Sequence, residues 1–276
     1  MWQQVICVTL DVMASIPLSP FRMAGASTAG LLAEASRRAA LASGPAPADA
    51  RGPAARLLLG ELATFATPIT RPFRRDFTLE RSANPQIVML LPGLATHPVR
   101  MRFMAEKLEQ AGHRTKRWGL GFNLGPSEEK FAALGVRLKE VHERYGRQVV
   151  LVGWSLGGIF AREIAKHQPE HVAKVVTMGS PFSGTPYANN AWRLYQLLAG
   201  HTVDCPPVKA ELAVKPPVET VALWSPRDGI VTPRSAAGHP GERDRAVALR
   251  CTHIGFSNSE EAIRTVAEEL ERTWQG

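Results

Sequence analysis

A run of apolar residues at 148–154, QVVLVGW, leads directly into Ser155, and this junction constrains the fold more than any other feature. The run has no polar face, which is typical of a central strand of a parallel sheet that is covered on both sides. After Ser155 the pattern changes at once to that of a helix over 156–168, which Pro169 ends. A strand, a sharp turn and a helix in immediate succession therefore predict an α/β architecture with Ser155 on the turn.

The same alternation of short apolar runs and helical patterns extends from residue 86 to the end of the chain. Strands are expected at 86–91, 113–118, 148–154, 174–180, 219–225 and 245–250, and helices at 98–111, 128–145, 156–168, about 187–199 and 260–274. We therefore expect a mostly parallel central sheet flanked by helices, within a domain that covers 54–276. The segment 182–218 separates two of these strands and is expected to form a lid or cap, or else a packed insertion.

The first 53 residues have a different composition, rich in Ala, Gly, Pro and Ser, and they include the stretch ASGPAPADARGP. Such a segment buries too little apolar surface to fold alone, so we expect a poorly ordered N-terminal arm. At 54–66 the spacing of apolar residues, with Glu61 among them, predicts an amphipathic helix that ends at Thr67-Pro68. Because its polar face is not strongly cationic, we expect this helix to pack on the core rather than on lipid.

The overall charge and hydropathy exclude several classes of protein. The formal charge of +8 is spread along the chain without a dense basic patch, so we expect no nucleic-acid partner. No apolar stretch of about 18 residues lacks a charge or a breaker, and we therefore expect no stable membrane insertion, although peripheral contact with lipid stays open. The apolar start of the chain has no basic residues ahead of it and contains Asp11, which makes a poor secretory signal. We expect a cytoplasmic protein, with export as the alternative.

The three cysteines, Cys7, Cys205 and Cys251, have no metal-ligand spacing, so no metal site is expected. A disulfide between Cys205 and Cys251 would tie the insertion to the segment before the last helix, and it would require an oxidising compartment. Without a convincing signal peptide, we expect two unrelated thiols instead.

Ser155 lies in the motif Gly153-Trp154-Ser155-Leu156-Gly157, between an apolar strand and a helix. This is the setting of a nucleophile elbow, in which small residues let strand and helix approach while the serine points out above the sheet. A serine hydroxyl is a weak nucleophile at neutral pH, so it needs a general base, an acid that holds the base, and donors for the oxyanion that forms. The base and the acid are expected at the ends of later strands.

Asp228 follows the strand expected at 219–225, whereas Asp204 falls in the insertion and Asp244 in a polar segment that is typical of turns. His253 follows the strand expected at 245–250, while His239 lies in the breaker-rich stretch GHPGE. Ser155, Asp228 and His253 thus have the chain order of a catalytic triad. The backbone N–H groups of Leu156 and Leu94 are the expected oxyanion hole, because Leu156 follows the nucleophile and Leu94 follows the first core strand.

These residues resemble those of bacterial esterases and lipases of the α/β-hydrolase superfamily over roughly residues 54–273. The resemblance lies in Leu91-Pro92-Gly93-Leu94, the loop from Trp118 to Pro126, the elbow with Gly158, Gly179-Ser180-Pro181, Asp228-Gly229-Ile230-Val231 and His253-Ile254-Gly255. It implies the α/β-hydrolase fold with the triad and oxyanion hole already named, acting on a small-molecule or lipid ester with no cofactor. One departure is the pair Pro92-Gly93, where relatives often carry His-Gly, and it leaves the acyl preference open.

The substrate is expected to contact Trp154 in the elbow and Trp192 in the insertion, whose aromatic and leucine side chains suit a hydrophobic acyl group. His97 lies near the expected oxyanion loop, either at the mouth of the pocket or as an exposed loop histidine. Two other functions are compatible with the same residues. One is a thioesterase or acyltransferase that uses the same triad, and the other is a binding protein of hydrolase fold without turnover.

Overall fold

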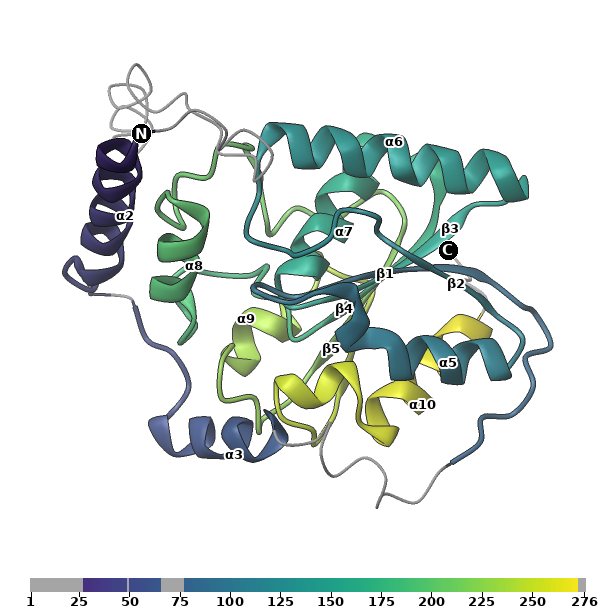
Figure 1. Ribbon diagram of the computed structural model, residues 1–276. Helices are drawn as coiled ribbons and strands as arrows, with labels where there is room; N and C mark the ends of the chain where they lie inside the picture. Colours follow the sequence, from purple (N-terminus) through teal and green to yellow (C-terminus); the bar gives the residue numbers. More distant parts are fainter. Residues whose placement is uncertain (1–26, 49, 66–76, 273–276) are drawn as a thin grey trace.

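Six parallel strands form one sheet at the centre of the molecule (Figure 1). The structure, a computed structural model, describes residues 27–48, 50–65 and 77–272, with only the backbone described at 62–65. The strands are β1 (Ile87–Leu91), β2 (Arg114–Arg117), β3 (Val149–Trp154), β4 (Val172–Met178), β5 (Glu219–Trp224) and β6 (Arg245–Ala248). They lie in the order β2-β1-β3-β4-β5-β6, and every neighbouring pair is parallel.

Helices cover both faces of this sheet, with α6 and α7 on one side and α5 and α10 on the other (Figure 1). The helical segments are α2 (Thr28–Ser43), α3 (Ala55–Phe65), η2 (Pro98–Met101), α5 (Arg102–Gln110), α6 (Glu128–Tyr145), α7 (Leu156–His167), η3 (Pro169–His171), α8 (Trp192–Ala199), α9 (Pro233–Ala237), η4 (Ile254–Ser257) and α10 (Glu260–Glu271). The predicted architecture, a mostly parallel sheet flanked by helices, is confirmed.

The core consists of two hydrophobic clusters, one on each face of the sheet. Val88 and Leu90 of β1 point into the cluster that contains side chains of α5 and α10. Met89 and Leu91 point into the other cluster, with side chains of α6 and α7. Successive residues of a strand face opposite sides, so a strand covered on both sides must be apolar at every position. This is why β1 and β3 appear in the sequence as uninterrupted apolar runs.

Some element boundaries differ from those expected. The strand expected at 174–180 begins at Val172, and the helix expected at 98–111 divides into η2 and α5, because Pro98 begins a tight 3-10 turn whose cap is the His97 side chain. Helix α9 was not expected, since five residues are too few to show a period. The insertion at 182–218 lies between β4 and β5 and contains α8, which is shorter than the helix expected there. Its action as a lid stays a prediction.

Within the segment 1–53, expected as a poorly ordered arm, residues 28–43 form the helix α2, which lies beside α8 (Figure 1). Arg38 donates to the carbonyl oxygen of Leu198 at 2.6 Å and Arg37 to that of Gly200 at 2.9 Å, so two arginines satisfy carbonyl groups at the end of α8. Hydrogen bonds from both arginines lower the pKa of Glu34 to about 2. The helix thus depends on a packing partner about 160 residues away in sequence.

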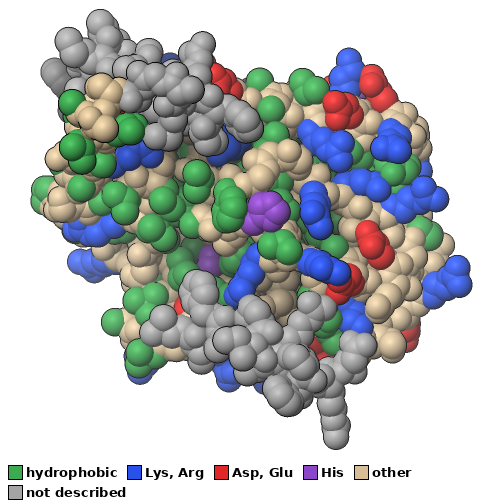
Figure 2. All heavy atoms as spheres, viewed as in Figure 1, with side chains coloured by type: hydrophobic (Ala, Val, Ile, Leu, Met, Phe, Trp, Pro, Cys, Tyr) green, Lys and Arg blue, Asp and Glu red, His purple; other side chains and the backbone are tan. Residues whose placement is uncertain are grey.

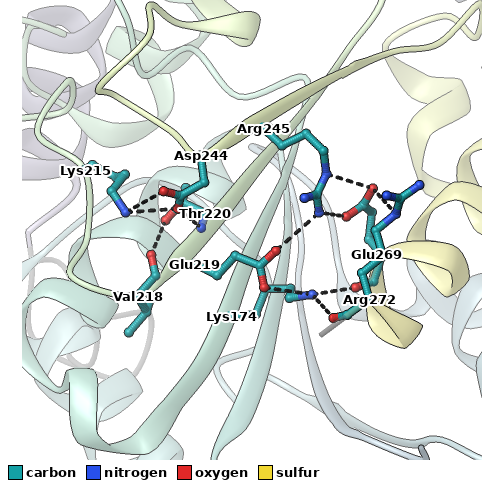
Figure 3. A network of polar contacts seen from close by, with 9 residues as sticks. All are labelled: Lys174, Lys215, Val218, Glu219, Thr220, Asp244, Arg245, Glu269 and Arg272. Atoms are coloured by element: carbon teal, nitrogen blue, oxygen red, sulfur yellow. Dashed lines mark hydrogen bonds and ion pairs between the residues drawn. The ribbon is translucent and has the colours of Figure 1, made fainter. Parts of the chain in front are cut away.

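A polar network crosses the edge of the sheet opposite to the carboxyl ends of the strands (Figure 3). Lys174 of β4 and Glu219 of β5, both buried, form an ion pair at 2.9 Å, and Arg245 of β6 lies 3.3 Å from the same carboxylate. Arg245 also pairs with Glu269 of α10. Each buried charge therefore has an opposite charge beside it, as burial requires.

Some expectations concern residues outside the described ranges. They are the apolar leader at the start of the chain, the helix end at Thr67-Pro68 and the last residues of the closing helix expected to reach Trp274. Within the described ranges, no helix is both long and apolar enough to cross a membrane.

Candidate active site

The site lies where the direction of strand addition reverses. From β1 the chain adds β2 on one side of the sheet, then returns to place β3 on the other side of β1 and continues outward to β6. Loops that leave the carboxyl ends of two such strands diverge and open a crevice, which is where doubly wound sheets bind ligands. Leu94 follows β1 and Ser155 follows β3, and the strand pairing aligns Leu91 with Gly153. Leu94, one expected oxyanion donor, and Ser155, which directly precedes the other donor Leu156, therefore flank this crevice.

Ser155 has the backbone conformation of a sharp elbow, with φ 55° and ψ −123°. A positive φ is unfavourable for a residue with a side chain, typically by about 1–3 kcal/mol, so the surrounding packing must hold it. A Cβ on Gly153 would lie 2.4 Å from the Cα of Gly158, and a Cβ on Gly157 would lie 2.2 Å from the carbonyl oxygen of Leu91. Glycine is therefore required at both positions, because Gly153 in β3 lies against α7 and Gly157 in α7 lies against the end of β1.

Asp228 and His253 come together at the ends of β5 and β6. Nδ1 of His253 lies 2.7 Å from Oδ2 of Asp228, and a carboxylate only accepts, so the ring nitrogen is the donor. The other oxygen, Oδ1, accepts from the backbone N–H groups of Ile230 at 2.8 Å and Val231 at 2.7 Å. Both side chains are almost fully buried. The loop after β5 thus fixes the carboxylate, and the carboxylate fixes the imidazole.

The pKa of His253 is raised above its ordinary value of 6.5. Burial acts in the opposite direction, since it disfavours the charged imidazolium, but the carboxylates of Asp228 and Glu61 stabilise that charge and outweigh it. The imidazole is therefore a better proton acceptor than a histidine in water.

The histidine loop is attached to the elbow through the indole of Trp154. The ring nitrogen Nε1 donates to the carbonyl oxygen of His253 at 2.9 Å, and the two rings are 5.9 Å apart. Trp154 is buried in the core cluster and is not among the residues that line the pocket. Its place is therefore beneath the histidine loop, whereas it was expected to contact substrate.

The loop after β1 lies against the elbow, because a Cβ on Gly93 would be 3.2 Å from the Cβ of Ser155. Asn123 is fully buried, and its side-chain amide donates to the carbonyl oxygen of Pro92 at 2.8 Å. Its backbone carbonyl oxygen accepts from the backbone N–H of Ala95 at 2.7 Å. Ala95 has a φ of 58°, so the loop is held in a conformation that few residues adopt. Sequence reasoning did not single out Asn123, and the only signal was its place in the glycine-rich loop 118–126.

A pocket that is partly open to solvent begins at Ser155 and continues between α7 and the insertion. Leu94 and Leu156 line it beside the serine, and Trp192 and Tyr195 of α8 form part of the opposite wall. Most of the other lining side chains are aliphatic, aromatic or proline, and Glu163 is the charged residue among those that line the pocket. Figure 2 shows hydrophobic side chains gathered on the side of this face that carries α8. The pocket therefore suits an apolar group attached to the reacting carbon.

His97 and Cys251 are not among the residues that line the pocket. His97 accepts from the backbone N–H of Val99 and its ring lies 5.2 Å from that of Phe122, away from the pocket lining. Cys251 is a free, buried thiol, so the alternative of a disulfide between Cys205 and Cys251 is wrong. Cys205 is itself disulfide-bonded, so the expectation of two unrelated thiols is wrong for this residue. Among the described side chains, no group of three His, Cys, Asp or Glu residues is placed to hold a metal ion.

Comparison with known proteins gives a consistent assignment of the fold. A family model described as the alpha/beta hydrolase fold matches residues 86–199, from β1 to the end of α8. The propeptide form of a Bacillus licheniformis lipase is similar at 16% identity and a TM-score of 0.55, over 72% of this chain and 53% of that chain. A naproxen esterase of Bacillus subtilis is similar at 14% identity and a TM-score of 0.47, over 83% of this chain and the whole of the other. No curated protein matches by sequence.

The likeness to the Bacillus licheniformis lipase shows a shared fold, and the family model covers the strands and loops that carry Leu94 and Ser155. These two findings agree with the all-parallel sheet and with the elbow between β3 and α7. The chain has the α/β-hydrolase fold.

Proposed function

We propose that this protein is a serine hydrolase that cleaves carboxylic esters through an acyl-enzyme intermediate. The observation that carries the proposal is the 2.7 Å hydrogen bond between His253 and Asp228 in a loop held against the Ser155 elbow. A buried pair of this kind keeps the second ring nitrogen, Nε2, free of its proton, which is the state that a general base needs. The similar structure of a Bacillus licheniformis lipase points in the same direction.

In the first half of the reaction, Nε2 of His253 takes the proton of the Ser155 hydroxyl while the serine oxygen attacks the ester carbonyl. Asp228 stabilises the imidazolium that forms. Collapse of the tetrahedral intermediate breaks the bond to the alcohol, and His253 returns the proton to the leaving oxygen. In the second half, water takes the place of the alcohol and releases the acid by the same steps.

The negative oxygen of the tetrahedral intermediate needs donors that are in place before the reaction. The backbone N–H groups of Leu94 and Leu156 meet this need in the proposal, because both residues line the pocket beside Ser155. Leu156 is the first residue of α7, where N–H groups point out of the helix and its dipole favours negative charge. Asn123 holds the loop that carries Leu94, through its bond to Pro92.

The apolar pocket indicates the kind of ester. Trp192 and Tyr195 belong to the insertion, so the group that occupies the pocket packs against α8, and a hydrophobic acyl chain fits such walls. We therefore expect esters of medium or longer fatty acids to be better substrates than acetate esters. If the insertion acts as a lid on lipid, activity rises sharply when the ester exceeds its solubility limit.

A series of p-nitrophenyl esters of increasing chain length tests the proposal. The native protein should hydrolyse them with an optimum in chain length, and Ser155→Ala should lower kcat by roughly 10⁴-fold or more. Ser36→Ala on the exposed side of α2 is the matched control and should behave as the native protein. Hydrolysis that is unchanged in Ser155→Ala would refute the assignment, and transfer of the acyl group to an acceptor in preference to water would identify an acyltransferase instead.

A further inference from the structure

Glu61 is a buried carboxylate outside the proposed triad. It lies on α3, the helix before the sheet, and its side chain is 3% exposed. Its Oε1 accepts from the backbone N–H of Gly229 at 2.9 Å and from that of His253 at 2.7 Å, while Oε2 accepts from Ile254 at 2.9 Å. One side chain therefore joins the loop that carries Asp228 to the loop that carries His253.

Burial of the Glu61 carboxylate is unfavourable unless hydrogen bonds compensate for its lost hydration. Removing a carboxylate from water is unfavourable by several kcal/mol, and only well-placed donors compensate for that loss. Glu61 has three such donors, all from main-chain groups, and hydrogen bonds to a charged acceptor are about twice as strong as neutral ones. A glutamate on the apolar side of an amphipathic helix is therefore explained by what it binds.

The backbone of α3 also packs against both loops. A Cβ on Gly229 would lie 2.6 Å from the carbonyl oxygen of Leu57, so only glycine lets the acid loop approach the helix. A Cβ on Gly60 would lie 3.7 Å from Cγ2 of Thr252, which is ordinary contact with the residue before His253. Helix and side chain together hold the ends of β5 and β6 at a fixed separation.

We propose that Glu61 is a positioning residue for the proposed triad, one that sets the His253 main chain relative to Asp228 so that the bond between their side chains forms in the orientation needed for proton transfer. This inference rests on the proposed function. Glu61 touches neither substrate nor the serine, and it acts through the backbone of the two loops. Its effect should fall on the chemical step rather than on substrate binding.

Glu61 also contributes charge to the site. The carboxylates that act on His253 are Asp228, from the loop after β5, and Glu61, from α3, and both raise the pKa of the imidazole against the effect of burial. Cys251, nearby on the same loop, is a buried thiol whose pKa is itself raised by burial, so it stays neutral. Loss of the Glu61 charge should therefore lower the pKa of His253.

Glu61→Gln removes the charge of the side chain and keeps its length, whereas Glu61→Asp keeps the charge and shortens the side chain. In Glu61→Gln one oxygen still accepts from Gly229 and His253, but the amide nitrogen faces the Ile254 N–H, and the charge is gone. We expect kcat per active site to fall roughly 10- to 100-fold with KM within about twofold, and the acid limb of kcat/KM to move to lower pH. Glu61→Asp keeps the charge but is too short for all three donors, so kcat should fall while the acid limb stays nearer that of the native protein.

Active sites are counted by reaction of Ser155 with a fluorophosphonate, so a loss of folded protein does not mimic a loss of rate. Glu80→Gln, an exposed glutamate, is the matched control. The low-field proton resonance of the bond between His253 and Asp228 gives a second measurement, which should broaden or shift in Glu61→Gln.

A native kcat and a native acid limb in Glu61→Gln would overturn the inference. So would a smaller number of active sites that each turn over at the native rate, because that result describes a purely structural role. If the native protein neither hydrolyses esters nor reacts with the fluorophosphonate, the proposed function fails instead. The proton resonance then decides about Glu61, since an unchanged resonance in Glu61→Gln contradicts positioning.

Discussion

Substitution of Asp228 by asparagine is the sharpest test of the proposed site, because the structure dictates how the amide must lie. Oδ1 accepts two backbone N–H groups, from Ile230 and Val231, so the amide oxygen takes that position. The amide nitrogen is then left at the position of Oδ2, 2.7 Å from Nδ1 of His253. Since an amide nitrogen only donates, Nδ1 must become the acceptor and the ring proton must move to Nε2.

An imidazole with its proton on Nε2 cannot accept the proton of Ser155, although the shape of the site is kept. In a serine protease of unrelated fold, the same change of tautomer lowers kcat by about 10⁴-fold, which corresponds to roughly 5.5 kcal/mol in the barrier. We expect a loss of this order here. The KM and the free energy of unfolding should change little, because asparagine fills the same volume and keeps the two backbone donors bonded.

The assay is steady-state hydrolysis of a p-nitrophenyl ester near its optimum in chain length, with urea denaturation for stability. Asp204→Asn is the matched control, since this aspartate is exposed in the insertion. A kcat within about threefold of the native value in Asp228→Asn would refute the triad. A raised KM with unchanged kcat would also refute it, because it would place Asp228 among binding residues.

Three further predictions concern proton transfer, the elbow and the polar network. Activity requires neutral His253, and its pKa is raised above 6.5, so kcat/KM measured against pH should have its acid half-point above that value; a half-point below it contradicts the electrostatics. Gly157→Ala places a Cβ 2.2 Å from the Leu91 oxygen and should lower the free energy of unfolding by at least about 4 kcal/mol in urea, whereas Gly30→Ala, with ordinary contacts, should not. Lys174→Met leaves the buried Glu219 with Arg245 as its remaining ion-pair partner and should cost about 1–3 kcal/mol in the same measurement while kcat per active site stays native.

The sheet and the elbow were predictable from the sequence because burial and chemistry both restrict residue type there. A strand covered on two faces must be apolar throughout, so the run before Ser155 identified β3 to within a residue. The close approach of β3 to α7 allows only glycine at 153, and that of α7 to the end of β1 allows only glycine at 157, so the motif is recognisable in the sequence. Asp228 and His253 could be chosen by chain order, since the ends of parallel strands meet at one edge of the sheet.

The contacts between distant segments were not predictable in this way. The apolar residues of helix α2 recur only weakly at helical spacing. Two arginines of α2 bind carbonyl groups at the end of α8 and hold the helix beside the insertion. Trp154 was expected from the sequence to contact substrate. Its indole instead points beneath the histidine loop and binds a backbone carbonyl there.

Glu61 and Asn123 show why such residues escape sequence reasoning. Both bind main-chain groups of loops that are far away in the chain, and main-chain groups are the same at every position, so nothing in the partner sequence marks the contact. A nucleophile, a base or an acid is restricted by its chemistry, whereas a residue that orients a loop is restricted only by where its oxygen or nitrogen lies. For Glu61 the sign available beforehand was a departure from the pattern, a glutamate among leucines on an amphipathic helix. Because burial of a charged side chain is unfavourable, a glutamate at such a position indicates that its carboxylate binds specific partners in the folded protein.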